Sequence, residues 1–108
     1  MGTIHIGPVT VARTLPARTI GLIGRTRAAP MLFPKCHSIH TFFMRFPVDI
    51  LCLDRNDRVI KSMPGVKPWR VVSGGRRAAS VLELPAGYVR QKGLGVGDRI
   101  EYVEKSRP

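Results

Sequence analysis

Residues 40–54, HTFFMRFPVDILCLD, form the densest apolar and aromatic run of the chain and decide the prediction of its fold. In an extended strand successive side chains point to opposite faces, so His40 and Met44 would share one face while Thr41 and Arg45 share the other. Both faces of this run carry apolar groups, which favours a strand at the centre of a closed or two-layered sheet over an edge strand. The residues of the run that we expect in the core are Phe42, Phe43, Met44, Ile50, Leu51 and Leu53.

The rest of the chain is divided into short elements by Gly, Pro, Asn and Asp residues. Strands are expected at 3–6, 9–13, 38–46, 48–54, 59–63, 78–84 and 99–103, the first two forming a hairpin across Gly7-Pro8. Residues 31–33 are expected to form a short strand or a buried connector, and 71–72 could add a brief strand. Helices are expected at 15–25, after an N-cap at Thr14, and at 85–92, where Gly93 would end the helix. The turn at 54–58 is favoured because Asn and Asp bond their own backbone.

These elements predict one domain, residues 1–108, because a chain of this length can bury a single core without disulfides. We predict a mainly β (α+β) fold: a small closed or strongly bent, antiparallel-rich β-barrel of about six to eight short strands with two short helices. The helices would cover the openings of the barrel.

The composition is strongly basic, with 18 Lys and Arg against 7 Asp and Glu and a net charge of +11. The first acidic residue is Asp49, so the N-terminal half should carry a positive field that attracts polyanions, unless the charge is only a solvated surface. No apolar run approaches the roughly 20 residues of a membrane span, and the N-terminus lacks the pattern of a signal peptide. A cytoplasmic location is expected, with Cys36 and Cys52 as reduced thiols.

Four motifs, in this order, resemble the family of small uncharacterised bacterial and archaeal proteins known as domain of unknown function 192. The motifs are Arg18-x-x-Gly21-Leu22-x-x-Arg25, His40-x-Phe42-x-Met44-x-x-Pro47-x-Asp49-Ile50-x-x-Leu53-Asp54, Val81-Leu82-Glu83-Leu84-x-x-Gly87 and Gly93-Leu94-x-x-Gly97-Asp98. They cover about residues 12–103. The resemblance implies a compact, mainly β single domain and no assigned activity. Many relatives have an export signal that this sequence lacks, and relatives usually have a small or apolar residue in place of Cys36-His37.

The candidate site residues are ionisable groups in or near the central run. They are His40, Arg45, Asp49 and Asp54, with Arg18 and Arg25 on one flank of the predicted helix at 15–25. A carboxylate at Asp49 must be paired or hydrogen-bonded if it is buried. Two interpretations stay open: an Arg–Asp pair that ties the helix to the sheet, or a small polar pocket with His40 as general base or hydrogen-bond donor and the arginines as an anion clamp.

Three other motifs have both a chemical and a structural interpretation. Cys36, His37 and His40 could ligate zinc, but a fourth ligand is missing, so we expect no metal and no cofactor. The loop at 73–77 could cradle a phosphate, although it lacks the lysine of a P-loop and a mobile loop is favoured. Trp69, beside Lys67 and Arg70, could form a stacking platform, although a tryptophan that caps the barrel core is favoured.

Two functional hypotheses follow. The first is a non-enzymatic binding module whose basic surface, centred on Arg18, Arg25 and residues 67–77, binds an anionic ligand or polyanion. The alternative is a hydrolase or lyase-like enzyme that uses His40 with Asp49 and an arginine anion clamp. The sequence indicates neither the identity of the partner nor an oligomeric state.

Overall fold

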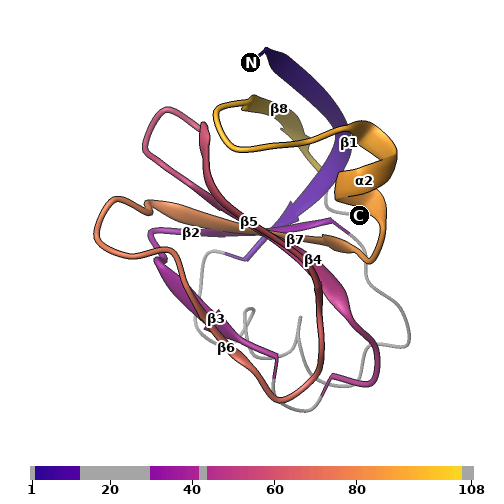
Figure 1. Ribbon diagram of the computed structural model, residues 1–108. Coiled ribbons are helices and arrows are strands. Elements are labelled where there is room, and N and C mark those ends of the chain that lie inside the picture. Colours follow the sequence, from indigo (N-terminus) through magenta and orange to yellow (C-terminus); the bar gives the residue numbers. More distant parts are fainter. Residues whose placement is uncertain (1, 13–29, 42–43, 106–108) are drawn as a thin grey trace.

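The computed structural model describes residues 2–12, 30–41 and 44–105 of the chain. These residues form eight strands and one short helix (Figure 1). The strands are β1 (Thr3–Val11), β2 (Met31–Pro34), β3 (Ser38–His40), β4 (Val48–Leu53), β5 (Val59–Val66), β6 (Val71–Ser73), β7 (Ser80–Pro85) and β8 (Arg99–Glu104), and the helix is α2 (Tyr88–Lys92). The helix predicted at 15–25 lies outside the described residues.

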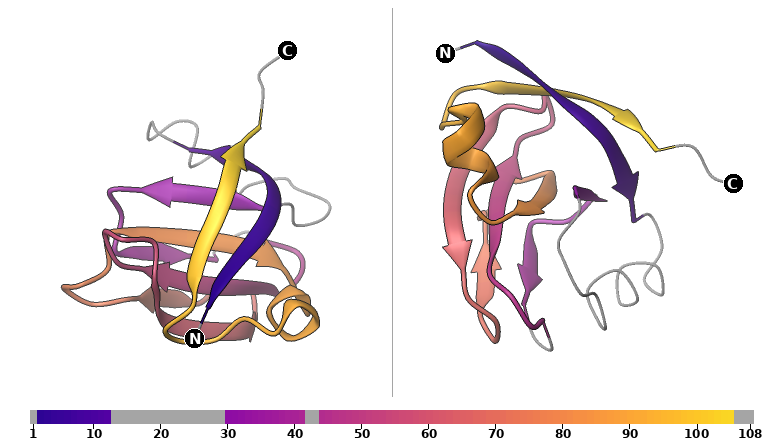
Figure 2. Two further views of the ribbon diagram at one scale, coloured as in Figure 1. Left: turned by 90° about the horizontal axis from the view of Figure 1, so that it is seen from above. Right: turned by 90° about the vertical axis from the view of Figure 1, so that its right-hand side faces the viewer.

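Six strands form one sheet in the order β5-β4-β7-β2-β1-β8, and β3 pairs with β6 in a separate small sheet. The large sheet curls strongly, so that β1 and β8 cross over the strands at its other end (Figures 1 and 2). At one end its two edges meet, because the Val59 N–H donates to the Asp98 carbonyl and the Gly97 N–H donates to the Val59 carbonyl, each at 2.8 Å. The predicted mainly β fold is confirmed as a curled half-barrel, whereas a fully closed barrel and a second helix are not confirmed.

The N-terminal hairpin predicted across Gly7-Pro8 is wrong. Residues 3–11 form the single strand β1, which pairs in parallel with both β2 and β8. The register with β8 shifts between His5 and Pro8, so the Gly-Pro pair makes an irregularity within the strand. Proline has no backbone N–H to donate, and a bulge is one of the few places where a strand accommodates it.

The long strand predicted at 38–46 is also wrong in extent. Of the described residues in this range, 38–41 and 44–46, only 38–40 form a strand, β3, which pairs antiparallel with β6. Within this segment Ile39 and Thr41 are buried, whereas His40 is exposed. Phe42 and Phe43 lie outside the described residues.

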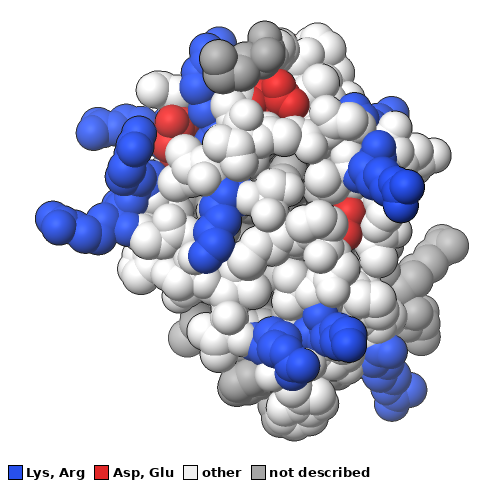
Figure 3. Space-filling view, in the orientation of Figure 1, with Lys and Arg blue, Asp and Glu red and all other residues white. Residues whose placement is uncertain are grey.

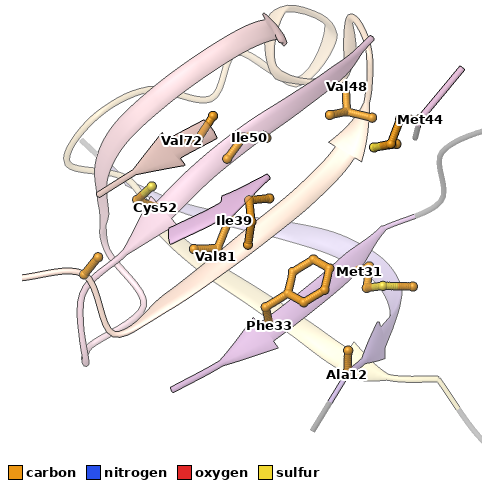
Figure 4. Packing of buried hydrophobic residues seen from close by; sticks show 11 residues of the cluster. Ala12, Met31, Phe33, Ile39, Met44, Val48, Ile50, Cys52, Val72 and Val81 are labelled. Carbon is orange, nitrogen blue, oxygen red and sulfur yellow. The ribbon is translucent and has the colours of Figure 1, made fainter. Parts of the chain in front are cut away.

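The core consists of two clusters on opposite faces of the large sheet, and β4 is its most buried strand, with every residue buried. Alternation in β7 places Val81 in one cluster and Leu82 in the other. Figure 4 shows the first cluster, in which Phe33, Ile50 and Val81 converge from three strands of the large sheet. The expected burial of Met44, Ile50, Leu51 and Leu53 is confirmed.

The described helix α2 lies between β7 and β8 in the chain; its Val89, and Leu94 just after the helix, belong to the second cluster. It begins after Gly87 (φ 90°) and ends at Gly93 (φ 67°), two positions where the left-handed backbone favours glycine. The predicted short helix before Gly93 is therefore confirmed, with a later start. Among the helices of the described residues, none is long and apolar enough to cross a membrane.

Candidate functional site

Asp49 is fully buried in β4 and is held by backbone amides from two other elements. Its Oδ1 accepts a hydrogen bond from the Gly65 N–H of β5 at 2.8 Å, and its Oδ2 accepts one from the Val89 N–H of α2 at 2.9 Å. Hydrogen bonds to an ionised group are stronger than neutral ones and offset the cost of burying the charge. The carboxylate therefore ties an edge strand and the helix to the centre of the sheet.

The other predicted site residues are dispersed. His40 is exposed on β3 and Arg45 is exposed in the segment before β4. The Asp54 Oδ1 accepts from the N–H groups of Asn56 (2.8 Å) and Arg58 (3.0 Å), which organises the turn between β4 and β5. Arg18 and Arg25 lie outside the described residues. The structure thus places His40 and Asp49 in different sheets, one exposed and the other sealed.

The cysteines and histidines at 36–40 are not gathered into a metal site. Within the described ranges, no three His, Cys, Asp or Glu side chains are grouped so that they could hold a metal ion. The Cys36 thiol donates to the Ser38 carbonyl at 2.8 Å, and both cysteines are free thiols. Burial raises the pKa of Cys52, the nearby Cys36 adds to this effect, and Lys61 opposes it.

Glu83 is a buried carboxylate that the sequence analysis did not single out. It is 0% exposed at the centre of β7, where its neighbours across the sheet are Met31 and Ile50. Alternation from Val81 turns its side chain toward the first core cluster, the face opposite to Asp49. The position of Glu83 inside the apolar run 81–84 indicates a buried carboxylate, in the same way that the position of Asp49 inside the run 48–53 does.

Lys and Arg are the only charged residues in the segment that contains β5 and β6. Residues 58–82 include Arg58, Lys61, Lys67, Arg70, Arg76 and Arg77 but no Asp or Glu. In Figure 3, Lys and Arg side chains lie at the left, over the β4–β5 turn and the β6–β7 loop, at the lower edge near the loop between β5 and β6, and at the upper right near α2. We name these exposed residues the basic strip: Arg55, Lys61, Lys67, Arg70, Arg76 and Arg77.

Two adjoining surface depressions share Arg76 and Arg77 of the basic strip. One, of about 680 Å³, is lined by Ile60, Gly74, Arg76 and Arg77. The other, of about 460 Å³, is lined by Asp54, Arg55 and residues 76–79. Both are open to solvent and both include Arg76 and Arg77, so two guanidinium groups can contact a ligand in either depression.

The backbone that carries Arg76 and Arg77 is anchored to the core. The Gly74 N–H donates to the His37 carbonyl at 2.8 Å, and the Ala78 N–H donates to the Gly75 carbonyl at 3.2 Å. Gly74 packs so closely on Cys52 that an added Cβ would lie 2.7 Å from the Cys52 Cβ. The two arginines therefore extend from a loop whose base is fixed by hydrogen bonds and close packing.

The loop at the other end of β6 is fixed by Thr41, which is 0% exposed. The Thr41 hydroxyl donates to the Lys67 carbonyl at 2.7 Å and accepts from the Arg70 N–H at 2.9 Å. The Thr41 main chain also bonds this loop: its N–H donates to the Arg70 carbonyl at 2.8 Å, and its carbonyl accepts from the Trp69 N–H at 3.0 Å. Four hydrogen bonds to one buried residue thus set the conformation of residues 67–70.

Trp69 itself has a left-handed backbone with φ 65°, a conformation that costs an L-residue about 1–2 kcal/mol. Its side chain is 56% exposed. The expectation that this tryptophan caps the barrel core is wrong. The Thr41 hydrogen bonds instead fix a backbone geometry in which more than half of Trp69 stays exposed.

These features define a small, mainly β domain with a curled half-barrel sheet, a buried Asp49 carboxylate that links β4 to β5 and α2 by hydrogen bonds, and a group of exposed cations, the basic strip. The DUF192 family model, described as uncharacterized ACR, matches residues 2–102, and the chain belongs to this family. The resemblance found in the four sequence motifs is thereby confirmed.

Archaeal relatives and two solved structures extend the comparison. A UPF0127 protein of Pyrococcus horikoshii is 30% identical over 102 residues, which are 89% of this chain and 88% of that protein. A UPF0127 protein of Pyrococcus furiosus is 35% identical over 65 residues, and the chain spans only 55% of its length. A Novosphingobium aromaticivorans protein of unknown function has the same fold, with a TM-score of 0.75 at 22% identity over 86% of this chain and 73% of that one. A candidate transcription regulator from Sinorhizobium meliloti also has a TM-score of 0.75, at 26% identity over 84% of this chain and 78% of that one.

Proposed function

We propose that this protein is a non-enzymatic binding module that holds a polyanionic partner against its basic strip. The observation that carries the proposal is that residues 58–82 include six Lys and Arg but no Asp or Glu, together with the Lys and Arg side chains that Figure 3 shows over the loops at both ends of β6. Each phosphate or sulfate that contacts such a cation releases a condensed counterion, and this release drives binding at low salt. The predicted contribution of Arg18 and Arg25 to the same surface is part of the proposal, as is a cytoplasmic location.

The enzymatic alternative, with His40 and Asp49 as catalytic groups, receives less support. Both oxygens of Asp49 already accept backbone hydrogen bonds, and the residue is fully buried. A general base must reach the proton that it removes, and His40 lies exposed in the other sheet. Nucleic acid is the first polyanion to test, because a protein of similar fold from Sinorhizobium meliloti is described as a candidate transcription regulator.

The test compares two double variants that remove the same charge. Arg76→Ala with Arg77→Ala removes two cations of the basic strip, and Arg90→Ala with Lys92→Ala removes two from α2. Helix α2 lies at the opposite end of the molecule from the β6–β7 loop in Figures 1 and 2. Affinity for a labelled oligonucleotide and for labelled heparin is measured by anisotropy from low to physiological salt.

We expect the Arg76/Arg77 variant to bind more weakly and to lower the slope of log K against log salt by about 2, since each phosphate contact contributes about 0.9. The α2 variant should keep the slope of the wild type. Equal losses in both variants would mean a generic attraction to net charge. No binding of either polyanion at low salt would overturn the proposed function.

A further inference from the structure

We propose that the polyanion is a single-stranded nucleic acid and that Trp69 stacks on one of its bases. In this arrangement Lys67, Arg70 and the rest of the basic strip contact the phosphates on either side of the stacked base. The inference rests on the proposed function, because it names the partner of the same surface. It adds an aromatic contact that a simple polyanion cannot use.

The first argument is the way in which the indole is presented. A large aromatic side chain at a left-handed φ of 65° is uncommon, and such outliers persist only where the surroundings enforce them. Here Thr41 enforces the conformation through four hydrogen bonds to residues 67–70. Trp69 is nevertheless 56% exposed, so the loop is organised around a residue with much of its surface accessible to solvent. A preorganised aromatic loses little conformational freedom when it binds.

The second argument is the charge around the ring. Lys67 and Arg70 are exposed on the two sides of Trp69 in the chain, and Val71, the residue that follows, is 69% exposed. Aromatic side chains within a positively charged groove are the common basis of single-strand binding, since every base offers a face for stacking. Bases inside a duplex are already stacked on both faces, which is why an unpaired strand fits this platform better.

The third argument is the extent of the surface. Trp69 and Arg76 flank β6 and are seven residues apart in the sequence, so their Cα atoms are separated by at most about 25 Å. The Lys61 Nζ donates to the Ser73 carbonyl at 2.7 Å and brings a further cation to the end of β6. A strand of several nucleotides can therefore contact the tryptophan and the two depressions at Arg76 and Arg77 together.

An anionic membrane surface also attracts Trp, Lys and Arg, but it requires a broader apolar area than this face offers. Of the large apolar side chains that are exposed in the described residues, only Trp69 and Val71 belong to this face, whereas Val96 and Val103 belong to the α2–β8 loop and to β8. The observations therefore favour a nucleic acid.

The experiment uses the single tryptophan of the chain as its reporter. Wild-type protein is titrated with an oligothymidine, with the matching duplex, with heparin, and with vesicles that contain phosphatidylserine, at the same low salt. We expect strong, saturable quenching of the Trp69 fluorescence with the oligothymidine and weaker quenching with the duplex. Heparin should bind, as measured by its own anisotropy, without comparable quenching.

The variant that isolates the stacking contact is Trp69→Ala, with Trp69→Phe as the conservative control. We expect Trp69→Ala to weaken oligothymidine binding by tenfold or more while heparin affinity stays within twofold, and Trp69→Phe to restore most of the loss. Circular dichroism confirms that the variants are folded, since the replaced side chain is exposed.

The outcomes separate the two proposals. If oligothymidine and heparin bind equally well and Trp69→Ala changes neither affinity, stacking is refuted while the polyanion-binding function stands. A blue shift and binding with vesicles alone would assign the loop to a lipid surface and would also refute the inference. If none of the polyanions binds at low salt, the proposed function fails as well.

Discussion

Replacing Asp49 by Asn tests whether the hydrogen bonds of this buried carboxylate stabilise the fold. The two hydrogen bonds of Asp49 go to different oxygen atoms, Oδ1 to the Gly65 N–H and Oδ2 to the Val89 N–H. An asparagine side chain has only one oxygen, so its NH₂ group would face one of these backbone donors. Either the buried Val89 N–H or the part-buried Gly65 N–H loses its acceptor, and the remaining hydrogen bond is no longer made to a charged group.

The size of the effect can be worked out from these contacts. A hydrogen bond to a charged group contributes about 1.5–3 kcal/mol, and an orphaned buried donor costs about 1–3 kcal/mol. The neutral amide costs less to bury than the carboxylate, which offsets part of the loss. We expect a net destabilisation of about 2 kcal/mol or more, which lowers the melting temperature of a domain of this size by about 8 °C or more.

A second Asp→Asn change provides the matched control. At Asp54 both backbone N–H groups, from Asn56 and Arg58, donate to the same atom, Oδ1. The asparagine oxygen can replace that acceptor, so Asp54→Asn should melt close to the wild type. Thermal unfolding of both variants by circular dichroism at pH 7 is the measurement. The reasoning is refuted if Asp49→Asn is as stable as Asp54→Asn.

Three further predictions follow from close packing and from shifted pKa values. Gly74→Ala should destabilise the fold by about 1–3 kcal/mol, because the new Cβ would lie 2.7 Å from the Cys52 Cβ, whereas Gly7→Ala, with nothing within 4 Å, should have little effect in urea unfolding. Backbone hydrogen bonds lower the pKa of Asp98 in the folded state, so the stability that the Asp98 carboxylate contributes is complete above the usual Asp pKa of about 3.9 and is lost as the pH falls through the lower folded value. Unfolding measured from pH 7 to pH 2 should therefore show the difference in stability between wild type and Asp98→Asn becoming smaller over that acidic range. A difference that stays constant would contradict this prediction. Burial raises the pKa of Cys52, so a thiol-specific reagent at pH 7 should modify at most Cys36 in the native protein. In denaturant both cysteines should react. Rapid labelling of two thiols in the native protein would count against the buried position of Cys52.

The sequence determined those features that depend on neighbours along the chain. Apolar residues of the central run predicted the buried strand at 48–54, and the Asn and Asp residues at 54–58 predicted the turn that follows. The glycine after a short helical segment predicted where α2 ends. The family motifs likewise sufficed to identify the family. Such signals are local, because strand alternation, turn formation and helix capping involve residues only a few positions apart.

Only the tertiary structure decided which distant segments meet. The parallel pairing of β1 with β8 joins the two ends of the described chain, and no local periodicity encodes a partner strand. The same holds for Asp49, whose backbone partners are 16 and 40 residues away, and for Thr41, whose hydroxyl fixes a loop 26 to 29 residues away. Sequence spacing showed that a buried carboxylate needs partners and that a tryptophan lies among cations. Whether the carboxylate is sealed and the tryptophan exposed depended on contacts between segments that are brought together only by folding.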